Sequence, residues 1–157
     1  MSAQPPASAR LIDTNVLLRH LLGDHALHSP AATRLIEQVE LGQVNAWTTA
    51  LTVAEVVFVL ASKRTYNQPR AVIRANVLPL IELPGLKIAN KRLYRRVFAL
   101  WLAYPRLSFV DAYEAALVEH RSPPELYSFD TDFDAISTLT RIDPAQTPRA
   151  PNGPLHP

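Results

Sequence analysis

Residues 10–18 read RLIDTNVLL, and this stretch decides the fold class. The apolar residues before Asp13 are typical of a short buried strand that ends in a carboxylate. Thr14 or Asn15 can cap a helix, and the apolar residues after them predict a short helix that ends at Gly23. The chain therefore begins with a strand, a polar turn and a helix.

The same alternation continues along the chain. Helices are expected over 29–42, 52–61, 69–82, 90–103 and 108–120. Short strands are expected over 46–49, 86–88, 126–129 and 139–142. Strands that alternate with helices favour a parallel sheet that is covered by helices on both faces. We therefore predict an α/β protein, a three-layer α/β/α sandwich with a central parallel sheet.

The length of 157 residues suits one domain. We expect the folded domain over residues 10–143, after a disordered leader at residues 1–9. Residues 144–157 carry five of the 14 prolines and few large apolar side chains, so we expect a disordered tail there.

The composition excludes several classes of protein. The chain has no cysteine, which excludes disulfide scaffolds, thiolate metal sites and a cysteine nucleophile. Its four glycines lie too far apart to form a glycine-rich nucleotide-binding loop. No apolar run reaches the length of about 18–20 residues that spans a bilayer, and the N-terminal residues do not resemble an export signal. We expect a cytoplasmic protein without a membrane partner.

Four acidic residues lie in apolar surroundings: Asp13, Glu55, Asp111 and Asp130. Each has an ordinary explanation when it is taken alone: a helix cap, a pair with a buried arginine, a helix-dipole contact or a turn. Two carboxylates about 6 Å apart repel by about 3 kcal/mol at an effective dielectric of about 20. Four together would need a shared counter-ion, and ligation by oxygen alone favours Mg²⁺ or Mn²⁺ over zinc.

Basic residues concentrate between residues 63 and 96, where nine basic residues stand with one acid. This pattern suggests either a polyanion partner or a solvated helical face. Within this stretch, the expected helix over 90–103 carries the candidate contacts to an RNA backbone, which are Lys91, Arg92, Arg95 and Arg96.

Four segments together resemble the PIN-domain family, and within it the VapC-type toxins of toxin–antitoxin pairs. They are residues 11–18 (LIDTNVLL), 52–56 (TVAEV), 107–112 (LSFVDA) and 128–133 (SFDTDF). Their order and spacing agree with the family over residues 10–142. Glu114 departs from the pattern, because the family usually has an apolar residue there, and it lies either near the site or exposed on the helix.

The resemblance implies a metal-dependent endoribonuclease that uses Mg²⁺ or Mn²⁺. It implies catalytic and metal-binding roles for Asp13, Glu55, Asp111 and Asp130, with Asp132 as a further metal ligand. It implies that the polar residues that orient ligands or substrate are Thr14, Asn15 and Ser128. The partners that it implies are an RNA substrate, a cognate antitoxin and a second copy of the chain.

Three alternatives stay open at this point. The first is a non-catalytic PIN-like module that binds RNA or serves assembly. The second is a Mg²⁺-dependent phosphatase, because Asp130 and Asp132 have the Asp-x-Asp spacing of such enzymes, although they lie near the end of the chain. The third is a receiver-like signalling domain, which normally has an adjacent acidic pair after its first strand, whereas Thr14 and Asn15 follow Asp13 here.

Overall fold

The computed structural model describes residues 8–146. Within that range the helices are α1 (Thr14–Leu22), α2 (His28–Glu40), α3 (Ala50–Ala61), α4 (Arg70–Glu82), α5 (Tyr94–Ala103) and α6 (Phe109–Val118). The strands are β1 (Arg10–Leu11), β2 (Ala46–Trp47), β3 (Leu86–Lys87), β4 (Glu125–Tyr127) and β5 (Thr140–Ile142). Three 3₁₀ turns complete the order: η1 (Lys91–Leu93), η2 (Thr131–Ala135) and η3 (Pro144–Gln146). Most of the leader and tail expected at 1–9 and 144–157 lies outside the described residues.

Local signals set the helix ends. Asp13 itself caps α1, because its carboxylate accepts a hydrogen bond from the Val16 amide at 3.0 Å, so the cap precedes both Thr14 and Asn15. Gly23 follows α1 with a φ of 64°, in the left-handed region that glycine adopts without strain. Ser108 caps α6, as its position before an apolar run suggests.

All strand pairs are parallel, and they form two sheets. The first sheet has the order β1-β2-β3, with Arg10 opposite Ala46 and Ala46 opposite Leu86. The second sheet pairs β4 with β5, with Glu125 opposite Thr140. The predicted α/β class with parallel strands is confirmed. The expectation of a single central sheet is corrected in one detail, because β4 pairs with β5 and not with the first sheet.

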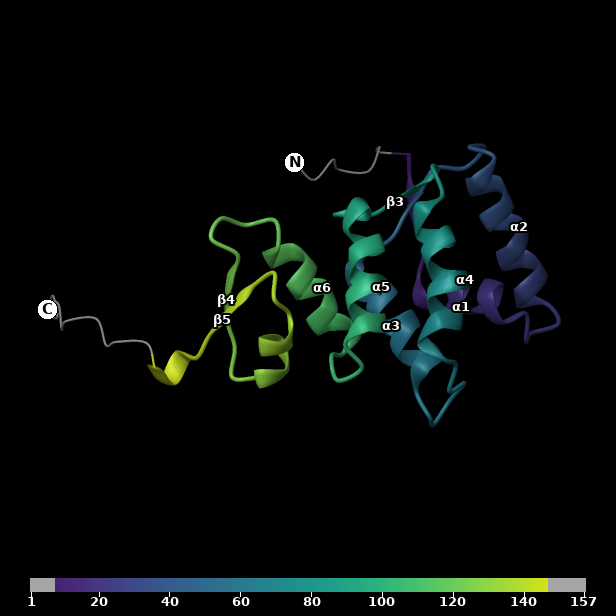
Figure 1. Ribbon diagram of the computed structural model, residues 1–157. Helices are drawn as coiled ribbons and strands as arrows, with labels where there is room; N and C mark the ends of the chain where they lie inside the picture. Colours follow the sequence, from purple (N-terminus) through teal and green to yellow (C-terminus); the bar gives the residue numbers. More distant parts are fainter. Residues whose placement is uncertain (1–7, 147–157) are drawn as a thin grey trace, which may run out of the picture.

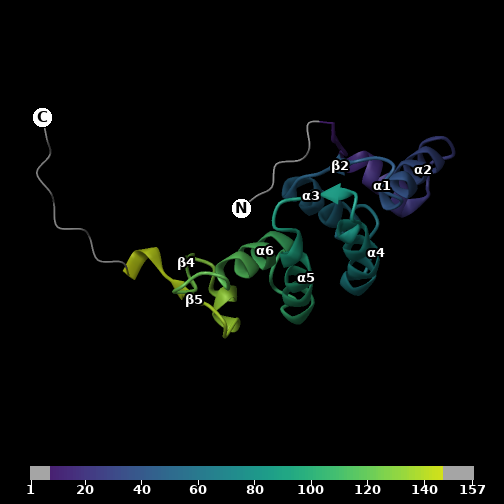
Figure 2. The ribbon, with the colours of Figure 1, turned by 90° about the horizontal axis from the view of Figure 1, so that it is seen from above.

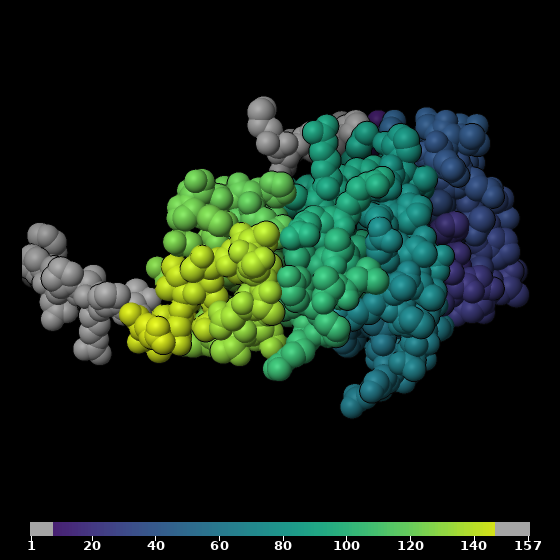
Figure 3. Space-filling view, in the orientation of Figure 1, coloured from purple at the N-terminus to yellow at the C-terminus, as the bar shows by residue number. Residues whose placement is uncertain are grey.

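The two sheets lie in different parts of the molecule. Both ribbon views place β4 and β5 beyond α6, on the side away from the purple strand near the N-terminus (Figures 1 and 2). The space-filling view shows the same residues, in light green and yellow, along one side of the helices (Figure 3). We call residues 119–146 the C-terminal unit and residues 10–107 the N-terminal body, with α6 between them.

The hydrophobic core lies mainly among the helices of the N-terminal body and α6. Phe98 and Tyr94 of α5 are fully buried, and the ring of Phe98 lies 5.1 Å from that of Phe109 on α6. Trp101 meets Phe109 edge to face, with 5.5 Å between the ring centroids. This aromatic cluster fixes α6 against α5.

Arg70 holds the connection between α5 and α6. Its guanidinium lies 4.6 Å from the ring centroid of Trp101 and donates to the carbonyls of Pro105 and Leu107 at 2.9 and 3.0 Å. Burial lowers the pKa of the Arg70 guanidinium. This member of the basic stretch therefore stabilises the fold and does not belong to an open cationic face.

The helix expected over 90–103 starts differently from the prediction. Asn90 adopts a left-handed conformation with a φ of 55°, and η1 follows it before α5 begins at Tyr94. Lys91 and Arg92 therefore lie on the 3₁₀ turn, while Arg95 and Arg96 lie on the α-helix. The four basic side chains do not share one regular helical face.

Over residues 8–146, none of the helices has both the length and the apolar composition that crossing a membrane requires.

Candidate active site

Asp13 follows β1 and begins α1, so it lies where the first strand ends. One carboxylate oxygen, Oδ1, caps the helix, and the side chain is exposed. Parallel strands deliver such residues to the carboxyl edge of the sheet, which is where ligands bind in open α/β sheets.

Glu55 lies on α3 next to this position. The hydroxyl of Thr14 donates to Glu55 Oε2 at 2.6 Å, so Thr14 links the carboxylate to the start of α1. Glu55 is exposed, and Leu51 (82% exposed) and Phe58 (71% exposed) lie uncovered on the same helix. A pair with a buried arginine was one ordinary explanation of Glu55, and the structure instead gives its side chain solvent and one hydroxyl donor.

Asp111 lies in the first turn of α6. It forms a reciprocal capping box with Ser108, in which the Ser108 amide donates to Asp111 Oδ2 at 2.8 Å. Glu114 follows one turn later and is exposed, as one of the two sequence interpretations has it. Burial of part of the side chain, and then the charge of Asp111, raise the pKa of Glu114.

Asp130 and Asp132 lie in the C-terminal unit, just after β4. The Asp132 amide donates to Asp130 Oδ1 at 2.8 Å, and the Asp130 amide donates to the Ser128 hydroxyl at 3.0 Å. Asp132 pairs with Arg106 at 2.8 Å. Ser128 therefore shapes the turn that carries Asp130.

The four carboxylates have one feature in common. One oxygen of each accepts a hydrogen bond, which is local for the three aspartates and comes from Thr14 for Glu55, and no other donor of the described residues reaches the second oxygen. The second oxygens are Asp13 Oδ2, Glu55 Oε1, Asp111 Oδ1 and Asp130 Oδ2. A carboxylate that is oriented by one oxygen and free at the other is suited to bind a metal ion or a substrate.

The four carboxylates do not all meet in this conformation. Among residues 8–146, no three side chains of histidine, aspartate or glutamate are grouped so that they could hold a metal ion. Thr14 joins the region of Asp13 to Glu55, whereas Asp130 belongs to the second sheet. The strand pairing explains why Asp130 lies apart from Asp13. Residues that follow β4 and β1 would lie close together only if these two strands were neighbours in one sheet, and β4 pairs with β5 instead.

Three of the four basic residues named from the sequence have protein partners: Lys91, Arg95 and Arg96. Lys91 donates to the carbonyl of Leu86 at 2.8 Å, and burial lowers the pKa of its ammonium. The ion pairs on α5 join Arg95 to Glu82 at 2.6 Å and Arg96 to Glu119 at 2.6 Å. Arg92 is exposed.

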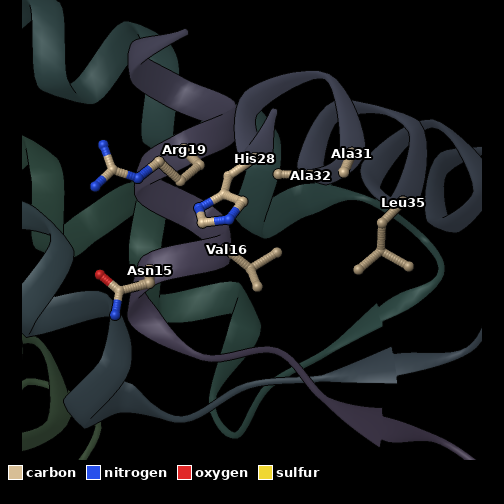
Figure 4. Close-up of a pocket in the computed structure, with 7 residues that line it drawn as sticks. All are labelled: Asn15, Val16, Arg19, His28, Ala31, Ala32 and Leu35. Carbon is tan, nitrogen blue, oxygen red and sulfur yellow. The ribbon is translucent and has the colours of Figure 1, made fainter. Parts of the chain in front are cut away.

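A groove between α1 and α2 was not foreseen from the sequence. It has a volume of about 310 Å³ and begins at Asn15, two residues after Asp13. Figure 4 shows the ring of His28 between the two helices, with Arg19 and Asn15 on the α1 side. The sequence carries no local signal for this groove, because it depends on how α1 packs on α2.

The fold and these residues define an α/β protein with carboxylates after two parallel strands and at the start of a helix. The model of one family, the PIN domain, matches residues 10–139. The chain therefore belongs to the PIN domain family, a superfamily of metal-dependent nucleases. No curated protein matches the chain. The resemblance to the PIN-domain family is confirmed.

Proposed function

We propose that the protein is an endoribonuclease that requires Mg²⁺ or Mn²⁺ and acts as the toxin of a toxin–antitoxin pair. The observation that carries this proposal is the family match over residues 10–139, which includes all four candidate carboxylates. The hydrogen bond from Thr14 to Glu55 supports it, because it links two of these segments at one place.

The chemistry of the donor set fits a hard dication. The donors are carboxylate oxygens, and the chain has no cysteine. The residues that would hold the ion are Asp13, Glu55, Asp111 and Asp130, with Asp132 as a further ligand. A bound dication lowers the pKa of a water molecule and neutralises charge on the phosphate.

The chain's own residues orient these donors. Thr14 fixes one oxygen of Glu55, so the other oxygen can bind the ion or accept a proton from the attacking water. The capping bond to Val16 does the same for Asp13. Attack by water predicts products with a 5′-phosphate and a 3′-hydroxyl. Asn15, which lines the start of the groove beside Asp13, is placed to orient the substrate.

The basic residues are proposed to contact the RNA backbone. Arg92 is exposed, and Arg95 has an exposed side chain whose ion pair with Glu82 lies at the surface. Surface ion pairs contribute only about 0–1 kcal/mol, so a phosphate can replace the carboxylate at little cost. Lys91 and Arg96 are engaged more deeply, and we expect smaller contributions from them.

A non-catalytic RNA-binding or assembly role is the second candidate. The observation in its favour is that no three carboxylates of the described residues are grouped for a metal in one chain. The family match favours a nuclease over the phosphatase and receiver alternatives. A short neighbouring gene whose product blocks cleavage would support the toxin role and would identify the antitoxin.

The test is the cleavage of end-labelled RNA with Mg²⁺ or Mn²⁺, with and without EDTA. Asp13→Asn should lower kcat/KM by more than about 100-fold, because loss of even an outer partner of a metal costs 10–100-fold. Asparagine still caps α1, so stability should be kept. The control is Asp24→Asn at the other end of α1, which removes a surface pair with Arg19 and should cut normally. Wild-type cleavage by Asp13→Asn would refute the assignment.

A further inference from the structure

Among residues 8–146, four strands each have one edge without a strand neighbour: β1, β3, β4 and β5. Within residues 8–146, β1 pairs only with β2, and β4 pairs only with β5. In the first sheet the Ile12 amide bonds to the Trp47 carbonyl at 2.8 Å, so the hydrogen bonds of β1 run toward β2. An open edge is a template for pairing with another strand.

The edges of β1 and β4 are short and each carries one charged residue, yet they differ from the edge of β3 in what they expose. At β3, the other end of the first sheet, the Lys91 ammonium covers the carbonyl of Leu86. At β1 and β4, by contrast, apolar side chains are exposed: Leu11 to 52%, Tyr127 to 66% and the nearby Phe129 to 73%. Apolar, uncovered edges of this kind mark an interaction surface.

The C-terminal unit is tied to its position in its own chain. Glu119, at the end of α6, accepts hydrogen bonds from Arg96 on α5 at 2.7 and 2.6 Å, and another from Thr138 before β5. Arg106 and Asp132 form a second tie. With these ties in place, α6 lies between β4 and the β1 of the same chain (Figures 1 and 2). In this conformation β4 can therefore pair with a β1 strand only if that strand comes from another molecule.

The charges of the two edges are complementary. Arg10 begins β1 and Glu125 begins β4, both are exposed, and neither has an ion pair among the described residues. Both sheets are purely parallel, so a parallel β1–β4 pair continues either one. A register that aligns the first residues of the two strands would place Arg10 beside Glu125 and Leu11 beside Leu126.

We propose that two copies of this chain pair reciprocally, so that β4 of each copy extends the sheet of the other copy at β1. The exchange is two-fold symmetric and closes as a dimer. It rests on the proposed function in one respect: Asp13 and the Asp130 of the second copy then follow neighbouring parallel strands, and one nuclease site contains carboxylates from both chains.

Cross-linking tests the strand pairing without any use of activity. Because the chain has no cysteine, single cysteines can be placed by Leu11→Cys in one tagged copy and by Tyr127→Cys in another. After the two are refolded together, a short bis-maleimide should give a covalent dimer that carries both tags. The control uses Val72→Cys, at an exposed position on α4, in place of Tyr127→Cys. This control should give no covalent dimer that carries both tags. The absence of a cross-link between the two tagged copies would overturn the proposal, and so would a cross-link within one chain when a single copy carries both cysteines.

Complementation tests the shared site. Asp13→Asn and Asp130→Asn should each be inactive alone. Refolded together, they should recover roughly a quarter of wild-type cleavage, because half of randomly paired dimers are mixed and each holds one intact site. A mixture as inactive as either variant contradicts the exchange.

The two tests separate the exchange from the proposed function. A cross-link between chains together with an inactive wild-type protein would keep the exchange and reject the nuclease. An active wild-type protein that is monomeric and gives no cross-link between chains would keep the nuclease and reject the exchange.

Discussion

The N-terminal body and the C-terminal unit are built from the same kinds of element, yet they are stabilised differently. The body buries large side chains between helices, and Leu60, Ile73 and Phe98 are at most 1% exposed. In the C-terminal unit the buried apolar side chains are Phe133, Ile136 and Leu139, and both strands have exposed residues. The difference indicates that the body is stable through its own core, while the unit depends on a few contacts.

The candidate carboxylates divide along the same boundary. Asp13 and Glu55 belong to the body, Asp111 begins the helix between the two regions, and Asp130 belongs to the unit. A site that uses all four therefore depends on where the unit lies, as well as on the local bonds that orient each carboxylate.

The largest expected effect comes from the small core of the C-terminal unit. Phe133→Ala removes one of its three buried side chains and should cost about 3–5 kcal/mol locally. Hydrogen exchange should show faster exchange in β4 and β5, while α3 and α4 stay protected. Ser137→Ala, at an exposed position of the same unit, is the control and should change stability little. Equal loss of protection in both regions would show that they unfold as one unit.

The next effect tests the N-terminal body. A Cβ at Gly85 would lie 2.2 Å from the backbone oxygen of Val39, so Gly85→Ala forces β3 away from α2 and should cost about 3 kcal/mol. Gly23→Ala is the matched control, because its φ of +64° is strained for alanine but the space is open, and it should cost about 1 kcal/mol. Urea denaturation measures both. An equal cost for the two variants would contradict the close approach.

A smaller effect tests the tie between the two regions. Arg96 lowers the pKa of the Glu119 carboxyl through a hydrogen bond, and the Thr138 hydroxyl lowers it further. The stabilisation is therefore present above the ordinary pKa of 4.5 and is lost as the pH falls through the lower value in the folded state.

Glu119→Gln should accordingly cost about 1–2 kcal/mol near neutral pH and less in acid. Urea denaturation at several pH values measures the difference from wild type. Glu40→Gln, at an exposed position at the end of α2, should match wild type throughout. A cost for Glu119→Gln that does not change with pH would show that the carboxylate charge contributes nothing.

The smallest expected effect lies within the body, at the contact between α1 and α2. His20 contacts the Thr33 hydroxyl at 3.1 Å, and burial lowers the pKa of its imidazole from 6.5. The unfolded chain then binds the proton more readily, so stability should be complete above pH 6.5 and should fall as the pH drops below it. Thermal unfolding of His20→Gln should lack this part of the pH dependence. Identical pH profiles of stability for the variant and the wild type would contradict a contribution from His20.

Much of the fold could be predicted because its signals are local. Gly23 ends α1, Ser108 begins α6, and the short apolar runs become the strands. Strand pairing is not local, so the sequence could not reveal that β4 pairs with β5 alone. Asn90 adopts a left-handed conformation that asparagine tolerates, but this residue type does not by itself distinguish a turn from a helix start.

The candidate site was predictable in its residue types more than in its geometry. The sequence singles out Asp13 and Glu55 because carboxylates in apolar segments are unusual. It could not show that Thr14 joins them, since Thr14 and Glu55 are 41 positions apart in the chain. Nor could it show that Lys91 and Arg96 have protein partners, because these contacts come from distant elements.

The central claim is that Asp13 and Asp130, from the two different regions, bind the same dication. Calorimetric titration of Mn²⁺ into wild type, Asp13→Asn and Asp130→Asn tests it most directly, with Asp24→Asn as the control. Either site variant alone should lose the binding that wild type and the control retain. Wild-type affinity in Asp13→Asn or in Asp130→Asn would contradict the claim.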